Sequence, residues 1–366
     1  MIKILFIALL CFHGIIHLMG FAKAFGFANM GALTKDINKV QGVLWLIACI
    51  LFLLAAGFYG FSKYNWCVFA LLAVGISQYL IISSWQDARF GTIANIIIFV
   101  VTLIGFSSWN FHKQFESDYK LQLNAETKKA PDLLTENDLQ GLPVLIQNYL
   151  RQAGVVGKPK VRYFKIEFKG KIRKDEQAEW MPFKSVQYNF MENPTRLFFM
   201  NATMKGLPVA GYHAYKNGKA FMDIRLFSIF KVQYLDGPEM DLAETVTFFN
   251  DMCCMAPATL IDPRIEWQEI DDHLVQAAFN NQGLRVVAML QFNDKGQLIN
   301  FISNDRYNAE AKKRLPWSTP LKEYKSIRGI SVSSAADAVY SDTKGDFIYG
   351  TFQLTDLEYN GYLNKR

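Results

Sequence analysis

The chain has 366 residues, of which 51% are hydrophobic and 14% are aromatic. This length suits two domains, and the apolar content excludes a mostly disordered chain. Residues 1–111 hold six basic and two acidic residues, and residues 112–366 hold 33 and 31, a net charge of +2 for this larger part. A dedicated nucleic-acid-binding protein is therefore excluded, because phosphate recognition needs a concentrated basic face.

Long uncharged stretches follow one another in the first third of the chain. The intervals Lys3–Lys23, Lys39–Lys63, Lys63–Asp87 and Arg89–Lys113 enclose 19, 23, 23 and 23 uncharged residues. A helix of about 20 apolar residues crosses a bilayer. The sequence therefore predicts a four-helix transmembrane domain over residues 1–111, with spans near Ile4–Phe21, Val43–Phe61, Trp66–Trp85 and Phe90–Trp109. The first is interpreted as a retained helix, because no small-residue cleavage pattern stands near its end.

The orientation of these helices does not follow from their charges. An even number of spans places both chain ends on one side of the membrane. Four Lys or Arg residues near the helix ends fall on that side and four fall on the other, so the excess of positive charge that marks a cytoplasmic side is missing.

Residues 112–141 are interpreted as a polar linker, and residues 142–366 as an antiparallel β half-barrel domain. A short helix is expected at the start of this domain, between Pro143 and Gly154. From Val161 onward, apolar and polar residues alternate with the period of a strand. Arg196–Met204, for example, places Phe198, Met200, Ala202 and Met204 on one face. Turn signals such as Asn217-Gly218 separate about ten such runs, which is typical of an antiparallel meander.

One amphipathic helix interrupts the strands. Asp241 and Glu244 have the spacing of an N-terminal capping box, Leu242, Val246, Phe249 and Cys253 recur at helical spacing, and Pro257 closes the segment. A single helix beside so many strands must lay its apolar stripe on the sheet. The predicted fold class is α + β, a four-helix transmembrane domain followed by a curved antiparallel sheet plugged by one helix.

Four segments of the second part carry a family resemblance. They are Leu207–Gly218, Ala243–Ile261, Ile265–Asp272 and the run Pro316-Trp317…Tyr324…Gly329. In this order and spacing they resemble an uncharacterised bacterial family of unknown function, often found behind membrane helices, over roughly Leu142–Asn360. The resemblance implies a fold similar to periplasmic lipoprotein carriers, whose concave face holds acyl chains, and it implies no catalytic residue. The chain departs from the family at Met252–Met255, where a bulky aromatic residue is usual before the proline.

The two histidines of the first predicted span and the five cysteines are candidates for chemistry, but each group is better explained by a structural role. His13 and His17 share a face of the first predicted span, and such a pair inside a bilayer is a candidate metal site or proton relay. Hydrogen bonds to Gln78, Asn95 or Ser77 are the favoured interpretation. The five cysteines lack a CxxC spacing and are interpreted as packing residues. No metal site and no cofactor is predicted.

The second part contains no Gly-x-Ser-x-Gly, Walker, His-Glu-x-x-His or Rossmann motif. An enzyme of lipid or envelope metabolism, hydrolase-like and built on His213 with Asp223 or Glu244, stays an alternative. A protein-interaction or sensor domain is another, with an envelope protein as its partner.

The favoured interpretation is a membrane-anchored binding protein rather than an enzyme. Methionine is a poor choice for rigid packing, so a Met-rich concave face is typical of a groove for a flexible apolar chain as well as of a plain core. The ligand would be a lipid or a lipidated molecule taken from the membrane, and by analogy with the carriers the domain would lie outside the cytoplasm. The predicted ligand-binding residues are Phe198, Met200, Met204, Met222, Phe249, Trp267 and Met289.

Overall fold

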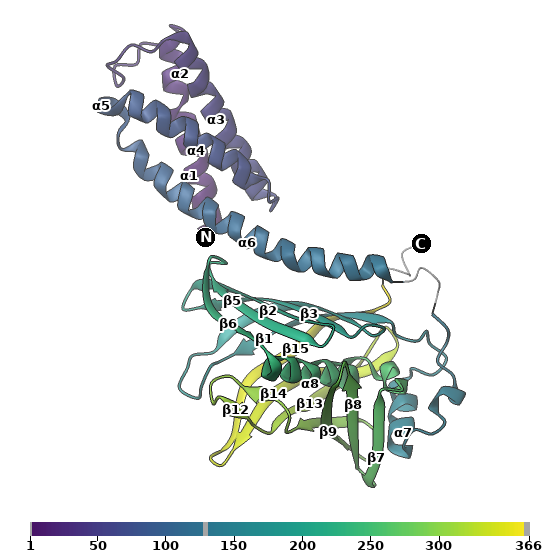
Figure 1. Cartoon of the computed structure of the whole chain (residues 1–366). Helices are drawn as coiled ribbons and strands as arrows, with labels where there is room; N and C mark the ends of the chain where they lie inside the picture. The colour runs from purple at the N-terminus through teal and green to yellow at the C-terminus, as the bar shows by residue number, and fades with distance from the viewer. Residues whose placement is uncertain (1, 127–130, 362–366) are drawn as a thin grey trace. The chain divides into compact units, whose positions relative to one another are not determined.

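The computed structural model describes residues 2–126 and 131–361. Contacts between Cα atoms divide the chain into two compact units, Met1–Phe111 and His112–Arg366. The first unit is helical and the second is built around one large sheet (Figure 1). Each unit is described by itself below.

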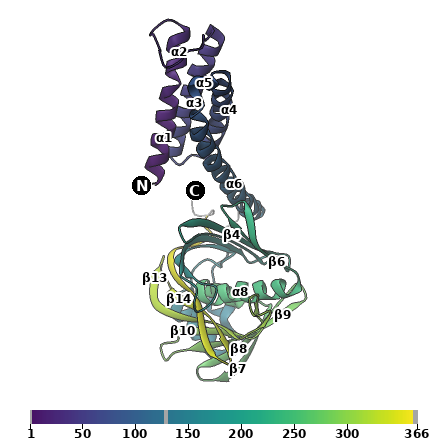
Figure 2. The same ribbon diagram turned by 90° about the vertical axis from the view of Figure 1, so that its left-hand side faces the viewer.

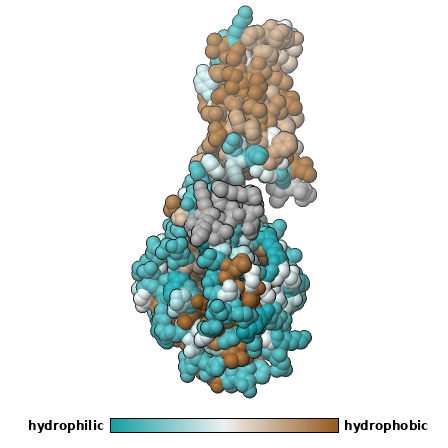
Figure 3. Space-filling model, turned by 90° about the vertical axis from the view of Figure 1, so that its right-hand side faces the viewer, coloured by the Kyte–Doolittle hydropathy of each residue, from teal (hydrophilic) through white to brown (hydrophobic). Residues whose placement is uncertain are grey.

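The N-terminal unit consists of apolar helices joined by short turns. Their bounds are α1 Ile2–Ile16, α2 Leu18–Ala24, α3 Lys39–Gly60, α4 Trp66–Ser83 and α5 Trp85–Ala88. Helix α6, Gly91–Ala125, begins in this unit and continues beyond its last residue, Phe111. Four stretches are long and apolar enough to cross a membrane, namely Lys3–Ala24, Lys39–Gly60, Trp66–Ser83 and Gly91–Ala125. Apolar residues cover most of the surface of this unit that is visible in Figure 3. The four apolar helices predicted from the sequence are confirmed.

A buried hydrogen-bond network links three of these helices. His13 Nε2 lies 2.9 Å from Asn95 Oδ1, and His17 Nε2 lies 2.9 Å from Ser77 Oγ. The Asn95 amide also donates to Ser77 and to Gln78. Polar side chains in apolar surroundings stabilise helix packing when their partners are supplied by neighbouring helices. The predicted interhelical hydrogen bonds of the two histidines are therefore confirmed, and Gln78 joins the network through its hydrogen bond with Asn95.

The second unit contains a 13-stranded antiparallel sheet with the order β6-β5-β4-β3-β2-β1-β15-β14-β13-β10-β9-β8-β7. The strands that form its first half are β1 Tyr163–Ile172, β2 Met181–Phe190, β3 Thr195–Met204, β4 Leu207–Lys216, β5 Lys219–Leu226 and β6 Phe230–Asp236. The second half contains β7 Ile265–Asp271, β8 Leu274–Asn281, β9 Leu284–Phe292, β10 Leu298–Ser303, β13 Trp317–Ile327, β14 Ile330–Asp342 and β15 Gly345–Tyr359. A separate small pair is formed by β11 Tyr307–Asn308 and β12 Lys313–Arg314.

The sheet curves around helix α8, Pro238–Met255, which is followed by the 3-10 helix η2, Pro257–Ile261 (Figure 2). Tyr215 of β4 and Asn281 of β8 are joined by a hydrogen bond, so the two halves of the sheet meet beside α8. The sheet is not closed, because β6 and β7 stand at its two ends. The predicted curved antiparallel sheet with one helix against it is confirmed.

The predicted capping box of α8 is wrong. The helix begins at Pro238 and its N-cap is Gly237, because proline suits the first turn of a helix. Asp241 lies inside the helix instead, where its carboxylate accepts hydrogen bonds from the Ala220 backbone and from Lys219 of β5. These contacts fix the start of α8 to the sheet.

Part of the stretch interpreted as a linker is helical. Helix α6 continues to Ala125, and Phe115 and Tyr119 pack against Tyr188, Phe199 and Tyr212 of β2, β3 and β4. Asp118 also contacts Tyr212 and Lys216. The 3-10 helix η1, Glu136–Leu139, and helix α7, Val144–Ala153, come next and precede β1. The end of α6 therefore packs on one face of β2, β3 and β4, and the opposite face of these strands is turned to α8.

Candidate functional site

The two faces of β3 have different partners. Leu197 and Phe199 point toward the end of α6, whereas Arg196, Phe198 and Met200 alternate with them and point toward α8. We call this second face of β1 to β5 the inner face. Residues directly opposite on neighbouring antiparallel strands share a face. The inner face can therefore be followed from strand to strand through the register of the sheet.

An ion cluster joins the inner face to α8. Arg196 donates to Glu244 at 2.9 Å, to Asp251 at 2.8 Å and to Gln187 at 2.9 Å. The side chains of Arg196 and Glu244 are only 7% and 2% exposed. Arg306 lies on the same face of α8, where it donates to Thr247 and stacks over Trp317 at 4.6 Å.

The two carboxyl groups of this cluster have opposite pKa shifts. Burial disfavours the charge of Glu244, but Arg196 and His213 hold the pKa of that carboxyl at about 2. Burial raises the pKa of Asp251 above its ordinary value, although Arg196 opposes this. Glu244 therefore keeps its negative charge down to low pH, and the Arg196–Glu244 pair is a buried electrostatic contact between the sheet and the helix.

Next to the cluster, the inner face becomes apolar. Phe183, Phe198, Met200, Ala202 and Val209 are buried together, and Phe168, Ile172, Ile224, Leu226 and Phe352 pack against them while being only partly buried. We call these ten residues the inner apolar group. Met222 lies opposite His213 in register and so borders the group, and Met204 ends β3 with 37% of its surface exposed. The group thus extends from the ion cluster toward solvent.

Two polar atoms at this apolar surface have no hydrogen-bond partner within the described residues. Ser185 Oγ is buried opposite Phe168 and Met200, and His213 Nε2 is buried beside Phe198, with 5.4 Å between the two ring centroids. The other ring nitrogen of His213, Nδ1, lies 3.7 Å from Glu244 Oε1. Buried polar atoms are nearly always paired with protein groups, water or an ion, so each of these two atoms marks a place where a bound group can form a hydrogen bond.

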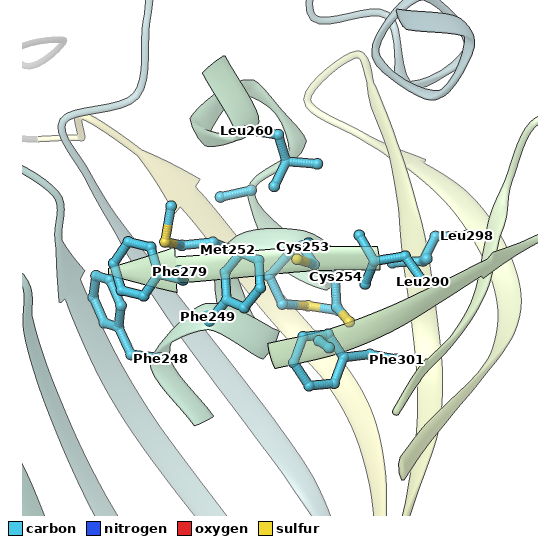
Figure 4. Packing of buried hydrophobic residues seen from close by; sticks show 14 of the residues in the cluster. Phe248, Phe249, Met252, Cys253, Cys254, Leu260, Phe279, Leu290, Leu298 and Phe301 are labelled. Carbon is cyan, nitrogen blue, oxygen red and sulfur yellow. The ribbon is translucent and has the colours of Figure 1, made fainter. Parts of the chain in front are cut away.

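The predicted ligand-binding residues fall into three places. Phe198 and Met200 belong to the inner apolar group, with Met222 and Met204 next to it. Phe249 is fully buried in the main core between Phe279 and Phe301, as Figure 4 shows, and Trp267 packs against the same core. Met289 alternates with the core residues Ala288 and Leu290 and faces away from them. The structure brings four of the seven together.

Three residues of this site were missed in the sequence. Arg196 has the same period-two spacing as the apolar residues Phe198 and Met200, so its side chain lies on the same face of the strand. A charged residue on an otherwise apolar face is the signal that could have revealed the ion cluster. Ser185 and Gly211, which lies on the inner face opposite Met200 and Ile224, carry no comparable signal. The proposed pair of His213 with Asp223 is wrong, because Asp223 lies on the other face of β5 and binds Arg225 and Lys231. Glu244 is the carboxylate that faces His213.

The described residues contain no group of three or more His, Cys, Asp or Glu side chains arranged to hold a metal ion. All five cysteines are free thiols, and Cys253 and Cys254 are buried in the core around α8. These two thiols therefore serve packing in this structure.

The chain belongs to a family of unknown function, DUF6544, whose model matches residues 132–352. No curated protein matches the chain. Among solved structures, it is similar to a LolA superfamily protein from Nitrosomonas europaea, with 11% identity, a TM-score of 0.33, and coverage of 60% of this chain and 94% of that one. It is also similar to a DUF1329 family protein from Desulfovibrio piger, with 12% identity, a TM-score of 0.34, and coverage of 59% and 92%.

Proposed function

We propose that this protein is a membrane-anchored binding protein whose half-barrel holds an apolar molecule, a lipid or a lipidated product, against the inner apolar group. The observation that carries the proposal is a pair of buried polar atoms, Ser185 Oγ and His213 Nε2, that have no partner among the described residues and lie at an apolar surface that contains methionines. A plain core of this kind would lose stability for each unpaired polar atom, by about 1–3 kcal/mol.

Binding would come from the burial of acyl surface, at about 25 cal/mol per Å². Met200 and Met222 are flexible side chains that can move aside for such a chain. The four apolar helices would hold the domain next to the bilayer, which is the source of the ligand. We further propose that the domain lies outside the cytoplasm.

A hydrolase built on His213 is the second candidate, because its Nδ1 faces Glu244 as a catalytic base would face its orienting carboxylate. A nucleophile would then have to lie within hydrogen-bond distance of Nε2, and no described side chain does. Ser185 is separated from His213 by strand β3, and two strand spacings amount to roughly 10 Å. The geometry therefore favours binding over hydrolysis.

Native mass spectrometry of the full chain in mild detergent tests the binding proposal. The wild-type protein is expected to carry a co-purified lipid, and Met222→Trp is expected to lose it because the larger ring fills the inner face. Met289→Trp is the matched control, since Met289 is a partly buried methionine on β9 that faces away from the core residues Ala288 and Leu290. Lipids bound around the apolar helices should be the same in both variants. Equal lipid content in the two variants would contradict the proposal.

A further inference from the structure

Gly211 leaves one position beside His213 Nε2 without a side chain, and we call that position the gap. Gly211 stands on the inner face opposite Met200 and Ile224. A methyl group added at Gly211 would lie 3.7 Å from Met200, 3.8 Å from Ile224 and 4.0 Å from His213 Nε2, which are ordinary contacts without a clash. Because glycine has no side chain, a ligand atom can approach the backbone at Gly211 more closely than at any other residue type, and a side chain here would occupy that gap beside His213 Nε2.

The hydrogen-bonding character of Nε2 follows from the opposite nitrogen of the ring. Nδ1 faces the Glu244 carboxylate, an acceptor, so Nδ1 is the nitrogen that carries the proton in the neutral ring. Nε2 then offers a lone pair to the gap. A ligand group that fits there must donate a hydrogen bond, as a hydroxyl does.

The charge of the site argues against an ionised ligand head. Arg196 is already paired with both Glu244 and Asp251, so its positive charge is not left over for a carboxylate or a phosphate. An anion next to Nε2 would also lie close to Glu244. The site therefore favours a neutral head.

Ser185 Oγ, the other of the two buried atoms, is close enough to His213 Nε2 for one ligand head to contact both. Nε2 lies near Gly211, and Gly211, Met200 and Ser185 are opposite one another on β4, β3 and β2, so Nε2 and Ser185 Oγ are roughly 10 Å apart. Two hydrogen bonds of about 2.8 Å leave roughly 4 Å between the two polar atoms of a ligand. The hydroxyl and an ester carbonyl of a glyceride have a spacing of this order.

We infer that the ligand is an acyl lipid with a neutral, hydroxyl-bearing head of the diacylglycerol class, whose hydroxyl donates to His213 Nε2 and whose ester carbonyl accepts from Ser185 Oγ. This inference rests on the proposed function and adds the chemistry of the head. The acyl chains lie on the inner apolar group, and the head lies at its border with the ion cluster. Met200 and Ile224 must move aside to admit it.

The test compares 1,2-dioleoylglycerol with its 3-O-methyl ether, which has the same chains and no hydroxyl donor. Both are titrated against the full chain in phosphatidylcholine nanodiscs, and binding is measured by native mass spectrometry. The ether is expected to bind about threefold to tenfold more weakly, the value of one hydrogen bond. Dioleoyl phosphatidate, with an anionic head on the same chains, is expected to bind more weakly than dioleoylglycerol.

Two variants locate the effect. His213→Phe removes the acceptor and Gly211→Ala fills the gap, so each should make the alcohol and the ether bind equally. Gly211→Ala meets no steric clash and should fold as the wild type does. His273→Phe, at an exposed histidine in the turn between β7 and β8, is the matched control and should keep the preference.

The outcomes separate this inference from the proposed function. Equal binding of alcohol and ether by the wild type, a preference that survives both variants, or tighter binding of the phosphatidate would overturn the hydroxyl-bearing head and leave an apolar ligand in place. No binding of any of the three lipids would overturn the proposed function itself.

Discussion

Arg196→Met is expected to lower the free energy of unfolding of the sheet unit by about 3–5 kcal/mol, the typical cost of leaving buried charges without their partner. Arg196 is the shared partner of Glu244 and Asp251, and the side chains of all three are largely buried. Methionine has a similar length but cannot donate hydrogen bonds. Arg196 helps to hold the pKa of the Glu244 carboxyl at about 2, and without it burial raises that pKa, so the buried carboxyl loses its partner whether it stays charged or takes up a proton.

The measurement is denaturant-induced unfolding of the full chain in detergent, followed by tryptophan fluorescence. Arg285→Met is the matched control, because Arg285 forms an exposed pair with Glu266. Exposed pairs contribute about 0–1 kcal/mol, so this variant should differ little from the wild type. If the two arginine variants lost equal stability, the ion cluster would not be the contact that fixes α8 to the sheet.

Phe249→Ala is expected to lower the free energy of unfolding by about 3–5 kcal/mol, because it opens a cavity in the main core. The Phe249 ring is fully buried and packs at 5.3 Å from Phe279 and 5.7 Å from Phe301, measured between ring centroids (Figure 4). We predicted Phe249 as a ligand-binding residue, and its packing instead favours a structural role. Lipid binding by the folded protein should therefore stay close to that of the wild type.

The same unfolding experiment checks this result, with Phe230→Ala as the control. Phe230 is 61% exposed at the start of β6, so its removal should change stability by less than about 0.5 kcal/mol. Loss of lipid from Phe249→Ala without loss of stability would return Phe249 to the binding site.

The fold was readable in the sequence where one period dominates a long segment. The uncharged stretches predicted the apolar helices, and the alternation of Phe198, Met200 and Ala202 predicted the inner face of β3. The end of α6 was missed because its apolar residues Phe115 and Tyr119 stand among charged ones, and their partners lie on strands far along the chain.

The site was only partly readable for a related reason. Alternation tells which residues share a face of a strand, and it correctly grouped Phe198, Met200 and Met204. It does not tell which part of that face a helix covers, so Phe249 could not be separated from them. The contact between His213 and Glu244 joins residues 31 positions apart, and only the packing of α8 on β4 brings them together.

The central claim, that an apolar molecule occupies the inner apolar group, is tested most directly by photo-crosslinking. The full chain in phosphatidylcholine nanodiscs would be exposed to a diacylglycerol with a diazirine on one acyl chain, and labelled peptides would be mapped by mass spectrometry. We predict labelling within β3 to β5, residues 195–226, that is removed by excess unlabelled lipid and by Met222→Trp. Labelling confined to residues 1–111 would contradict the claim.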